Sequence, residues 1–382
     1  MGHFRLLLAL LVVVAHTIPP GTLTVIHGEV AVRLFFAVSG FYMAMILAEK
    51  YRAGHPGRLW LFYSNRALRI LPQLWMAILA EVALAFILLG FGSLPEGHWL
   101  TDLRRLFHEG HLGLLTAYIT AQLSGFGVDC FFLFSLSPDL IPSLYAGKME
   151  GFIRGWRPLP LAHAWSISCE LCFYVAAPFL TRLRSWGLAL VILGSALLLM
   201  ALPRLTSPSF ASVAGSFWFP MQFGYFVLGI LSYRVYDKVR TFTPSTGLNG
   251  VRIGIVAALG LSMVFYTPLA ALSHTLSQIL LYGLAALAIP VLFQWSVRSK
   301  WDRSVGELSY PVYLVHITVK TALLAPWINA LFGGAFQNPF VYMLTTMTIS
   351  CGLSWVMLRL IDLPINQWRQ SRVLKAYARR SG

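Results

Sequence analysis

Three ionisable side chains lie inside stretches that are otherwise long and apolar: His16, Glu170 and His316. A charged side chain at the centre of a membrane-spanning helix costs about 2.5 to 3.5 kcal/mol on insertion scales, so a titratable group there is a candidate for function. A neutral imidazole can accept a proton from a hydroxyl or attack a carbonyl carbon itself. A carboxylate at similar depth can orient that imidazole and stabilise its protonated form. We therefore predict that His16 and Glu170 are catalytic.

Structural roles are the alternative for each of these residues. His16 ends an apolar run, where its ring could instead bond to a neighbour or face lipid headgroups. Glu170 could form a structural ion pair with an arginine such as Arg33, because a carboxylate among apolar residues needs a partner. His316 is open to both interpretations as well. Position along the chain does not decide between them.

Arg66 and Arg69 fall on one face if the segment that carries them is helical. A guanidinium group binds phosphate through two parallel hydrogen bonds, so the pair predicts an anchor for an anionic cofactor that enters from the cytoplasm. The alternative is that both are ordinary positive charges at the cytoplasmic end of a membrane helix.

The composition indicates a membrane protein, because 57% of the residues are hydrophobic and only 11% are charged. A soluble domain has roughly 25% charged residues. The formal net charge of +15 lies in short segments between apolar runs. We interpret it as membrane topology and attraction to lipid headgroups, and we expect no nucleic-acid partner. Cys169 and Cys172 form a Cys-x-x-Cys without a second pair, so we expect no metal site.

The elements that must position these side chains are apolar segments of about 20 residues, the length that crosses a bilayer as a helix. The sequence predicts an all-α polytopic membrane protein, a bundle of about ten transmembrane helices plus a re-entrant or interfacial segment. The predicted spans are 4–26, 30–48, 71–93, 164–181, 187–203, 209–233, 251–271, 275–297, 308–330 and 338–361.

Basic residues decide the orientation, because Lys and Arg accumulate in cytoplasmic loops. A further apolar stretch at 111–136 is interrupted by polar residues and glycines, and leaving it out places every basic cluster on one side. We therefore expect both termini in the cytoplasm, an outward region at 94–163 and a basic cytoplasmic tail at 365–382. The whole chain, 1–382, is predicted to be a single membrane domain.

Short motifs follow one another along nearly the whole chain in the order of a known family. They are Arg5 with His16, Phe35-Phe36-x-x-Ser39-Gly40, Arg66-x-x-Arg69-x-x-Pro72, Trp165-Ser166-x-x-x-Glu170, Ser309-Tyr310-x-x-Tyr313-Leu314-x-His316 and Asp362-x-Pro364. In this set the chain resembles acyltransferase family 3. These integral-membrane enzymes move acyl groups, most often acetyl, onto extracytoplasmic sugars and some other acceptors.

The resemblance implies a role for each motif. His16 would be the essential histidine, and Arg66 and Arg69 would hold acyl-CoA. From the same motifs, we assign donor binding to Arg5, Ser39, Tyr310 and His316.

The resemblance also implies substrates and a location. Acyl-CoA, with acetyl-CoA as the first expectation, would be the donor substrate, and no permanently bound cofactor is expected. The acceptor would be a carbohydrate or lipid-linked glycan, and the location a bacterial cytoplasmic (inner) membrane. One departure concerns Arg33, which stands where the family usually has an acidic residue. Glu29 is a candidate to replace that carboxylate, and its loss could instead point to a divergent acceptor.

Several alternatives stay open. His16 could be a general base, or a nucleophile that forms an acyl-histidine. A proton-coupled transporter or flippase could use the same buried His and Glu residues as a relay, and a non-catalytic scaffold would explain only the apolar bulk. For the acceptor, Trp99, Tyr118, Tyr145 and Trp156 in the outward region offer aromatic surface for sugar rings, although membrane interfaces use the same residue types.

Overall fold

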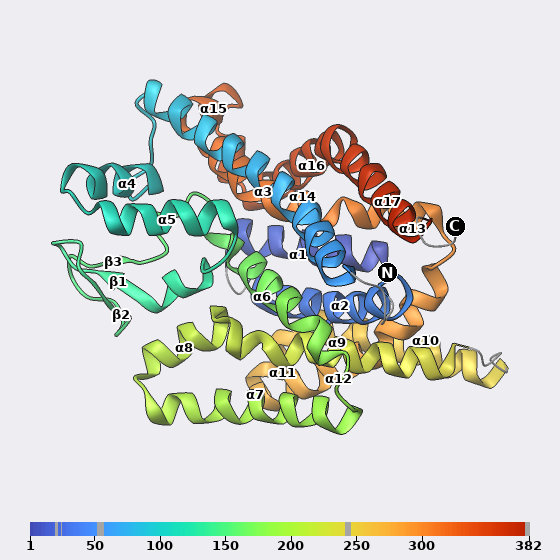
Figure 1. The fold of residues 1–382 in the computed structure, drawn as a ribbon. Helices are drawn as coiled ribbons and strands as arrows, with labels where there is room; N and C mark the ends of the chain where they lie inside the picture. The colour runs from blue at the N-terminus through green and yellow to red at the C-terminus, as the bar shows by residue number, and fades with distance from the viewer. Residues whose placement is uncertain (20–21, 24, 52–56, 241–245, 379–382) are drawn as a thin grey trace.

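The computed structural model describes residues 1–19, 22–23, 25–51, 57–240 and 246–378. Helices dominate it (Figure 1). In the first half they are α1 (Gly2–Thr17), α2 (Gly28–Glu49), α3 (Arg58–Gly90), α4 (Trp99–His108), α5 (Leu112–Ser124), α6 (Trp165–Leu180), α7 (Ser185–Leu205), α8 (Pro208–Phe217) and α9 (Phe219–Val239). The remaining ones are α10 (Thr246–Val264), α11 (Tyr266–Leu272), α12 (His274–Ser296), α13 (Lys300–Glu307), α14 (Ser309–Leu323), α15 (Pro326–Leu331), α16 (Pro339–Met357) and α17 (Leu363–Ala378).

Within the described residues, six helices are long and apolar enough to cross a membrane. A seventh span results if α10 and α11, which bend by 74° at their junction, are counted together. The all-α membrane class is thus confirmed, whereas the predicted ten spans are not. Predicted spans 4–26, 164–181 and 308–330 correspond to α1, α6 and α14, of 16, 16 and 15 residues. Such helices are shorter than the roughly 20 residues that a bilayer requires.

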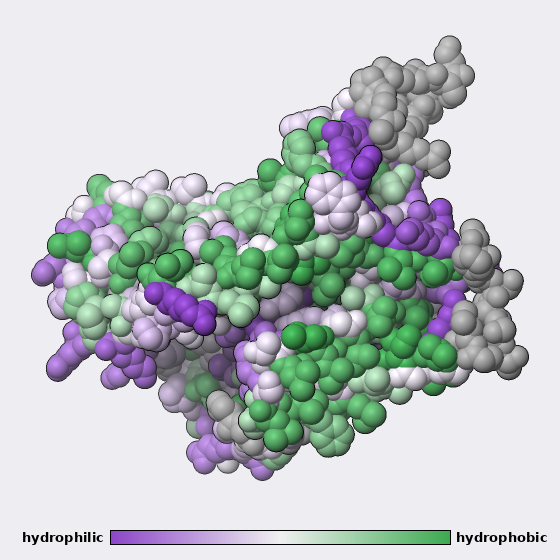
Figure 2. All heavy atoms as spheres, turned by 90° about the horizontal axis from the view of Figure 1, so that it is seen from below, coloured by the Kyte–Doolittle hydropathy of each residue, from purple (hydrophilic) through white to green (hydrophobic). Residues whose placement is uncertain are grey.

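The surface of the bundle carries the apolar residues that mark a membrane protein. Figure 2 shows hydrophobic side chains over most of the visible face, with hydrophilic ones gathered toward its edges. Large apolar residues such as Leu190, Leu193 and Leu197 on α7 are exposed. Exposed apolar area of this extent requires a partner, and a bilayer supplies it.

Helix ends follow local capping chemistry. Asn338 accepts hydrogen bonds from the backbone N–H groups of Phe340 and Val341 at the start of α16, and Pro339 occupies the first helical position. Ser207 caps α8 before Pro208 in the same way. These caps satisfy backbone donors that a helix leaves unpaired at its start.

The region at 94–163, which the sequence predicted to face outward, contains short strands that the sequence did not predict. It holds α4, α5, the 3-10 helices η1 (Asp129–Leu133) and η2 (Ala162–Ala164), and the strands β1 (Phe134–Leu136), β2 (Pro142–Leu144) and β3 (Ile153–Arg154). The sheet is antiparallel in the order β2-β1-β3, with Phe134 opposite Leu144 and Ser135 opposite Arg154. In Figure 1 this region lies on the left, whereas the N-terminus and α17 lie on the right.

Three of the aromatic residues predicted to form a sugar-binding surface are buried instead. Trp99, Tyr118 and Tyr145 are 8%, 1% and 6% exposed. Trp99 donates to Glu81 of α3, the Tyr118 hydroxyl donates to the Gly155 carbonyl, and Tyr145 packs under Arg154. Their role is to fasten the region to itself and to α3, because a buried Trp or Tyr needs a partner for its polar group.

The predicted basic tail at 365–382 is helical over its described part. Its described part forms most of α17, which follows α16 through the π-helical turn η4 (Leu358–Asp362) and lies along α3. Arg372 of α17 donates hydrogen bonds to Ser64 and Asn65 of α3. Residues 379–382 of the predicted tail, with the parts of the basic loops at 52–56 and 241–245, lie outside the described residues.

Helices α2 and α9 approach each other closely in the core, and glycines make this approach possible. A Cβ atom added at Gly40 would lie 1.9 Å from the Phe226 carbonyl oxygen, and one at Gly229 would lie 1.9 Å from the Ala37 carbonyl oxygen. Only residues without a side chain fit at these two positions.

Gly229→Ala is expected to destabilise the protein, because no rotamer can move its Cβ away from the α2 backbone. Overpacking a core costs about 1 to 3 kcal/mol or more. The measurement is the thermal unfolding midpoint in detergent. Gly194→Ala is the matched control, since nothing lies within 4 Å of a Cβ at that position. Equal midpoints for the two variants would show that the α2–α9 contact is not tight.

Candidate functional site

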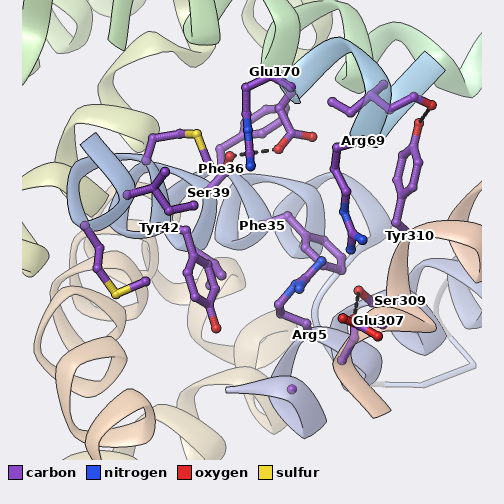
Figure 3. Close-up of a pocket in the computed structure, with 18 of the residues that line it drawn as sticks. Arg5, Phe35, Phe36, Ser39, Tyr42, Arg69, Glu170, Glu307, Ser309 and Tyr310 are labelled. Atoms are coloured by element: carbon purple, nitrogen blue, oxygen red, sulfur yellow. Dashed lines mark hydrogen bonds between the residues drawn. The ribbon is translucent and has the colours of Figure 1, made fainter. Parts of the chain in front are cut away.

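A cavity of about 550 Å³ lies among α1, α2, α3, α6, α13, α14 and α17. Figure 3 shows Arg5 of α1, Arg69 of α3 and Glu170 of α6 directed into the same space, with Tyr310 of α14 beside them. The arginines that line it are Arg5, Arg66, Arg69, Arg303 and Arg369, and the acidic residues are Glu49, Glu170, Asp302 and Glu307. Phe35, Phe36 and Met43 of α2 provide an apolar wall. The cavity thus joins a cationic part to an apolar part.

Arg69 is held by an ion pair. Its Nη1 atom lies 2.6 Å from Oδ2 of Asp362, whose side chain is 2% exposed. The two predicted arginines, Arg66 and Arg69, therefore differ in their hydrogen-bond partners. Arg69 already has a carboxylate partner, whereas the buried Nε of Arg66 has no hydrogen-bond acceptor among the described residues.

Glu170 bonds to hydroxyl groups at the cavity wall. Its Oε1 accepts a hydrogen bond from Ser39 Oγ at 2.8 Å and another from the Tyr174 hydroxyl. Neither predicted partner bonds to it: His16 bonds elsewhere, and Arg33 contacts Gln222 and lies 3.7 Å from Glu29. The prediction that Glu170 orients His16 is therefore not supported by their hydrogen bonds.

His16 lies beside His316, outside the cavity wall. The two rings are 3.3 Å apart between His16 Nδ1 and His316 Nε2. Their other hydrogen bonds go to backbone carbonyls: His316 Nδ1 to Tyr313 at 2.7 Å and His16 Nδ1 to Val12 at 2.9 Å. His316 is completely buried, whereas His16 is exposed.

These contacts fix which ring nitrogens carry protons. A carbonyl oxygen only accepts, so the Nδ1 atoms of both histidines must be the protonated nitrogens of the neutral rings. His316 Nε2 then holds a lone pair that faces the N–H of His16. This leaves Nε2 of His16 without a proton and able to act as a base or a nucleophile. His316 thus takes the orienting position that the sequence assigned to Glu170.

A hydrogen-bonded wall separates the cavity from the histidines. Ser166 Oγ donates to the Tyr313 hydroxyl at 2.7 Å, and that hydroxyl donates to the His163 carbonyl at 2.6 Å. Ser166 and Tyr313 line the cavity. On the other side, the His163 ring lies 5.1 Å from the His316 ring, centroid to centroid.

The predicted site residues thus fall into two groups. The structure gathers Arg5, Ser39, Arg66, Arg69, Glu170 and Tyr310 around one cavity. His16 and His316 form a second group beyond the Tyr313 wall. His316 does not line the cavity, so the donor-binding role predicted for it has no support from its position.

Three more acidic residues line the cavity, Glu49, Asp302 and Glu307, and their surroundings differ. Asp302 accepts backbone hydrogen bonds from Gly2 and His3 at 2.6 and 3.0 Å. Burial alone would raise the pKa of Asp302, but these hydrogen bonds outweigh it and hold the pKa well below its ordinary value. Burial raises the pKa of Glu307, against the opposing effect of Arg69. Glu49 pairs with Arg240 at 3.0 Å.

Sequence reasoning missed several polar residues. Glu81 is 2% exposed in the middle of α3 and accepts hydrogen bonds from Trp99 and Thr318. The rule that identified Glu170 applies equally to it. His163 lies two residues before Trp165 of the Trp165-Ser166 motif, which was a usable signal. Arg369 carried none, because its place in the cavity depends on how α17 folds back.

Comparisons with known proteins agree with the architecture. A family model described as an acyltransferase domain matches residues 1–359. The chain is also similar to the acyltransferase MdmB of Streptomyces mycarofaciens, with 29% identity over 219 residues. That alignment covers 49% of this chain and 55% of the relative, so the chain spans about half the length of that curated protein. No solved structure matches.

The family match extends over the first helices, the cavity and the histidine pair, and it ends in the turn that carries Asp362. It therefore covers the elements that build both groups of site residues, apart from α17. On this match the chain belongs to acyltransferase family 3.

Proposed function

We propose that this protein transfers an acyl group, acetyl as the first expectation, from acyl-CoA to a hydroxyl of an extracytoplasmic carbohydrate or lipid-linked glycan. The observation that carries the proposal is the pairing of an arginine-lined cavity with a histidine whose Nε2 is free to act as a base. The protein would lie in a bacterial cytoplasmic membrane with both termini in the cytoplasm.

The donor fits the cavity by its chemistry. Coenzyme A combines phosphate groups with a long, uncharged pantetheine arm. Guanidinium groups at the mouth suit the phosphates, and the wall of Phe35, Phe36 and Met43 suits the arm and the acyl chain. Arg5, Ser39 and Tyr310 remain proposed donor-site residues, and Glu170, which the sequence predicted to be catalytic, is proposed to belong with them. Glu170, which bonds to Ser39 and Tyr174, would shape the inner part of this pocket.

The acceptor would meet His16 from the other side of the wall. Because His16 is exposed and its Nε2 carries a lone pair, it can take the proton of an acceptor hydroxyl as that oxygen attacks the thioester carbonyl. The His16 ring then becomes positively charged. When the C–S bond of the thioester breaks, the ring gives this proton to the departing thiolate, and coenzyme A leaves as the thiol. His316 holds the His16 ring in place, because its Nε2 accepts from the Nδ1–H of His16. An acyl-histidine intermediate uses the same nitrogen.

The two groups can react only if the wall opens. The Tyr313 side chain and Ser166 lie between the cavity and the histidines. In this proposal the pantetheine arm displaces the Tyr313 ring, and the Ser166 and His163 hydrogen bonds break. The wall then keeps the donor from water until it is fully bound, as lids do in other enzymes.

His16→Ala is expected to abolish acyl transfer, since general-base catalysis contributes about 10² to 10⁴-fold. The assay is turnover of radiolabelled acetyl-CoA, with mass spectrometry of surface glycans, in membranes from expressing cells. His274→Ala, which changes an exposed histidine on α12, is the matched control and should retain activity. Unchanged glycan acylation together with altered solute uptake in the His16 variant would favour a transporter.

His316→Phe is expected to lower kcat by about tenfold or more and to leave KM for acyl-CoA unchanged. The reason is that His316 contacts His16 but not the cavity. Steady-state kinetics of detergent-purified protein measures both constants. The opposite pattern, a raised KM with normal kcat, would assign His316 to the donor site as the sequence predicted.

A separate experiment distinguishes the two roles of His16. Acetyl-CoA that carries a radioactive acetyl group is mixed with the protein without acceptor, and the chain is then digested. Label on the His16 peptide would establish an acyl-histidine. We expect no label, because His16 acts in this proposal as a general base and forms no bond to the acyl carbon.

A further inference from the structure

A further arginine reaches the cavity from α17, outside every motif of the sequence. Arg369 lines the cavity and is 8% exposed. Its Nε and Nη1 atoms are buried and have no hydrogen-bond partner among the described residues. A buried guanidinium is costly to leave unpaired, because each unmet donor loses its hydration without replacement.

Nearby charges do not resolve this deficit. Arg369 experiences the charges of Arg66, Arg69 and Asp362. Asp362 is already bonded to Arg69, and Arg66 has an unpaired buried donor of its own. Arg369 thus lies near two other guanidinium groups and one carboxylate that is already bonded to Arg69.

The other carboxylates that line the cavity have different partners. Glu49 pairs with Arg240, Glu170 accepts from Ser39 and Tyr174, and Asp302 accepts backbone N–H groups. Glu307 lies on α13, where burial raises its pKa and so disfavours its charged form. Among the described residues, none of the carboxylates that line the cavity is hydrogen-bonded to Arg66 or Arg369, so both cations face the cavity without a bonded anion.

Docking of α17 does not explain Arg369. The helix is fastened to α3 by Arg372, which donates to Ser64 and Asn65 and packs on Trp368. Arg369 lies about one turn earlier, on the part of α17 that borders the cavity. Its donors point to a ligand instead of a neighbouring helix.

We infer that Arg369 and Arg66 together form a phosphate-binding site that completes the donor pocket. This inference rests on the proposed function, since the phosphate would be one of those in acyl-CoA. The same chemistry could be met by the phosphate of an anionic lipid. In either case α17 closes the site, and Asp362 acts as a positioning residue that holds Arg69 beside it.

The experiment compares Arg369→Gln with Arg182→Gln in the full chain, purified and placed in nanodiscs of phosphatidylcholine. The probe is coenzyme A itself, and its dissociation constant is measured by isothermal titration calorimetry. We expect Arg369→Gln to weaken binding by about tenfold or more, because a charged hydrogen bond to phosphate is lost. Arg182 is an exposed arginine between α6 and α7 that does not line the cavity, so Arg182→Gln should bind as the unaltered protein does. Arg369→Lys should recover part of the loss. Thermal unfolding midpoints confirm that each variant is folded.

A second set of nanodiscs, which contain phosphatidylglycerol, separates nucleotide from lipid. If Arg369→Gln binds coenzyme A like the unaltered protein in phosphatidylcholine, the inference is wrong while the proposed function stands. The variant and the unaltered protein can bind coenzyme A equally in phosphatidylcholine while the variant binds phosphatidylglycerol more weakly. That result assigns the site to lipid and also overturns its role in the donor pocket. Failure of the unaltered protein to bind coenzyme A in either membrane would overturn the inference and the proposed function together.

Discussion

The ion pair between Arg69 and Asp362 is the contact on which the cavity depends. The buried carboxylate of Asp362 and the half-buried guanidinium of Arg69, 2.6 Å apart, stabilise each other, whereas removal of the arginine would leave a buried charge unpaired. The pair joins the first half of α3 to the π-helical turn η4, a segment far away in the sequence. From that turn α17 returns along α3, where Arg372 fastens it. The contact therefore places one arginine and brings a second helix to the mouth of the cavity.

Backbone carbonyls perform the corresponding task at the histidines. A carboxylate would add a charge to an apolar interior. The Val12 and Tyr313 carbonyls fix both neutral rings without adding one. The result is a directed chain in which His316 orients His16 and leaves one nitrogen of His16 available. The Tyr313 backbone supports this chain while its side chain forms the wall. Orientation of the histidines and separation of the two groups thus depend on the same residue.

The packing around the site shows why the polar groups can stay in place. Gly40 and Gly229 let α2 and α9 approach to backbone contact, which makes a rigid support for the wall that carries Phe36 and Ser39. At the other end, Glu81 joins α3 to α4 and α14 through Trp99 and Thr318. Asp102 and Arg157 hold the outward region together by two hydrogen bonds. Each buried charge in this set has a partner that neutralises or solvates it.

The sequence by itself determined the membrane class and the family, and it selected six of the residues that line the cavity: Arg5, Ser39, Arg66, Arg69, Glu170 and Tyr310. The composition indicates that the protein lies in a membrane, and short motifs with fixed spacing identify the family without coordinates. The number of spans was not determined, since α1, α6 and α14 are apolar over longer stretches than they are helical, and hydropathy does not report where a helix ends. Only the tertiary structure decided that His316 and not Glu170 contacts His16, that Tyr313 separates the two groups and that Arg369 enters the cavity. These are contacts between residues far apart in the chain, and they depend on how helices cross and turn back, which a local pattern of residue types does not encode.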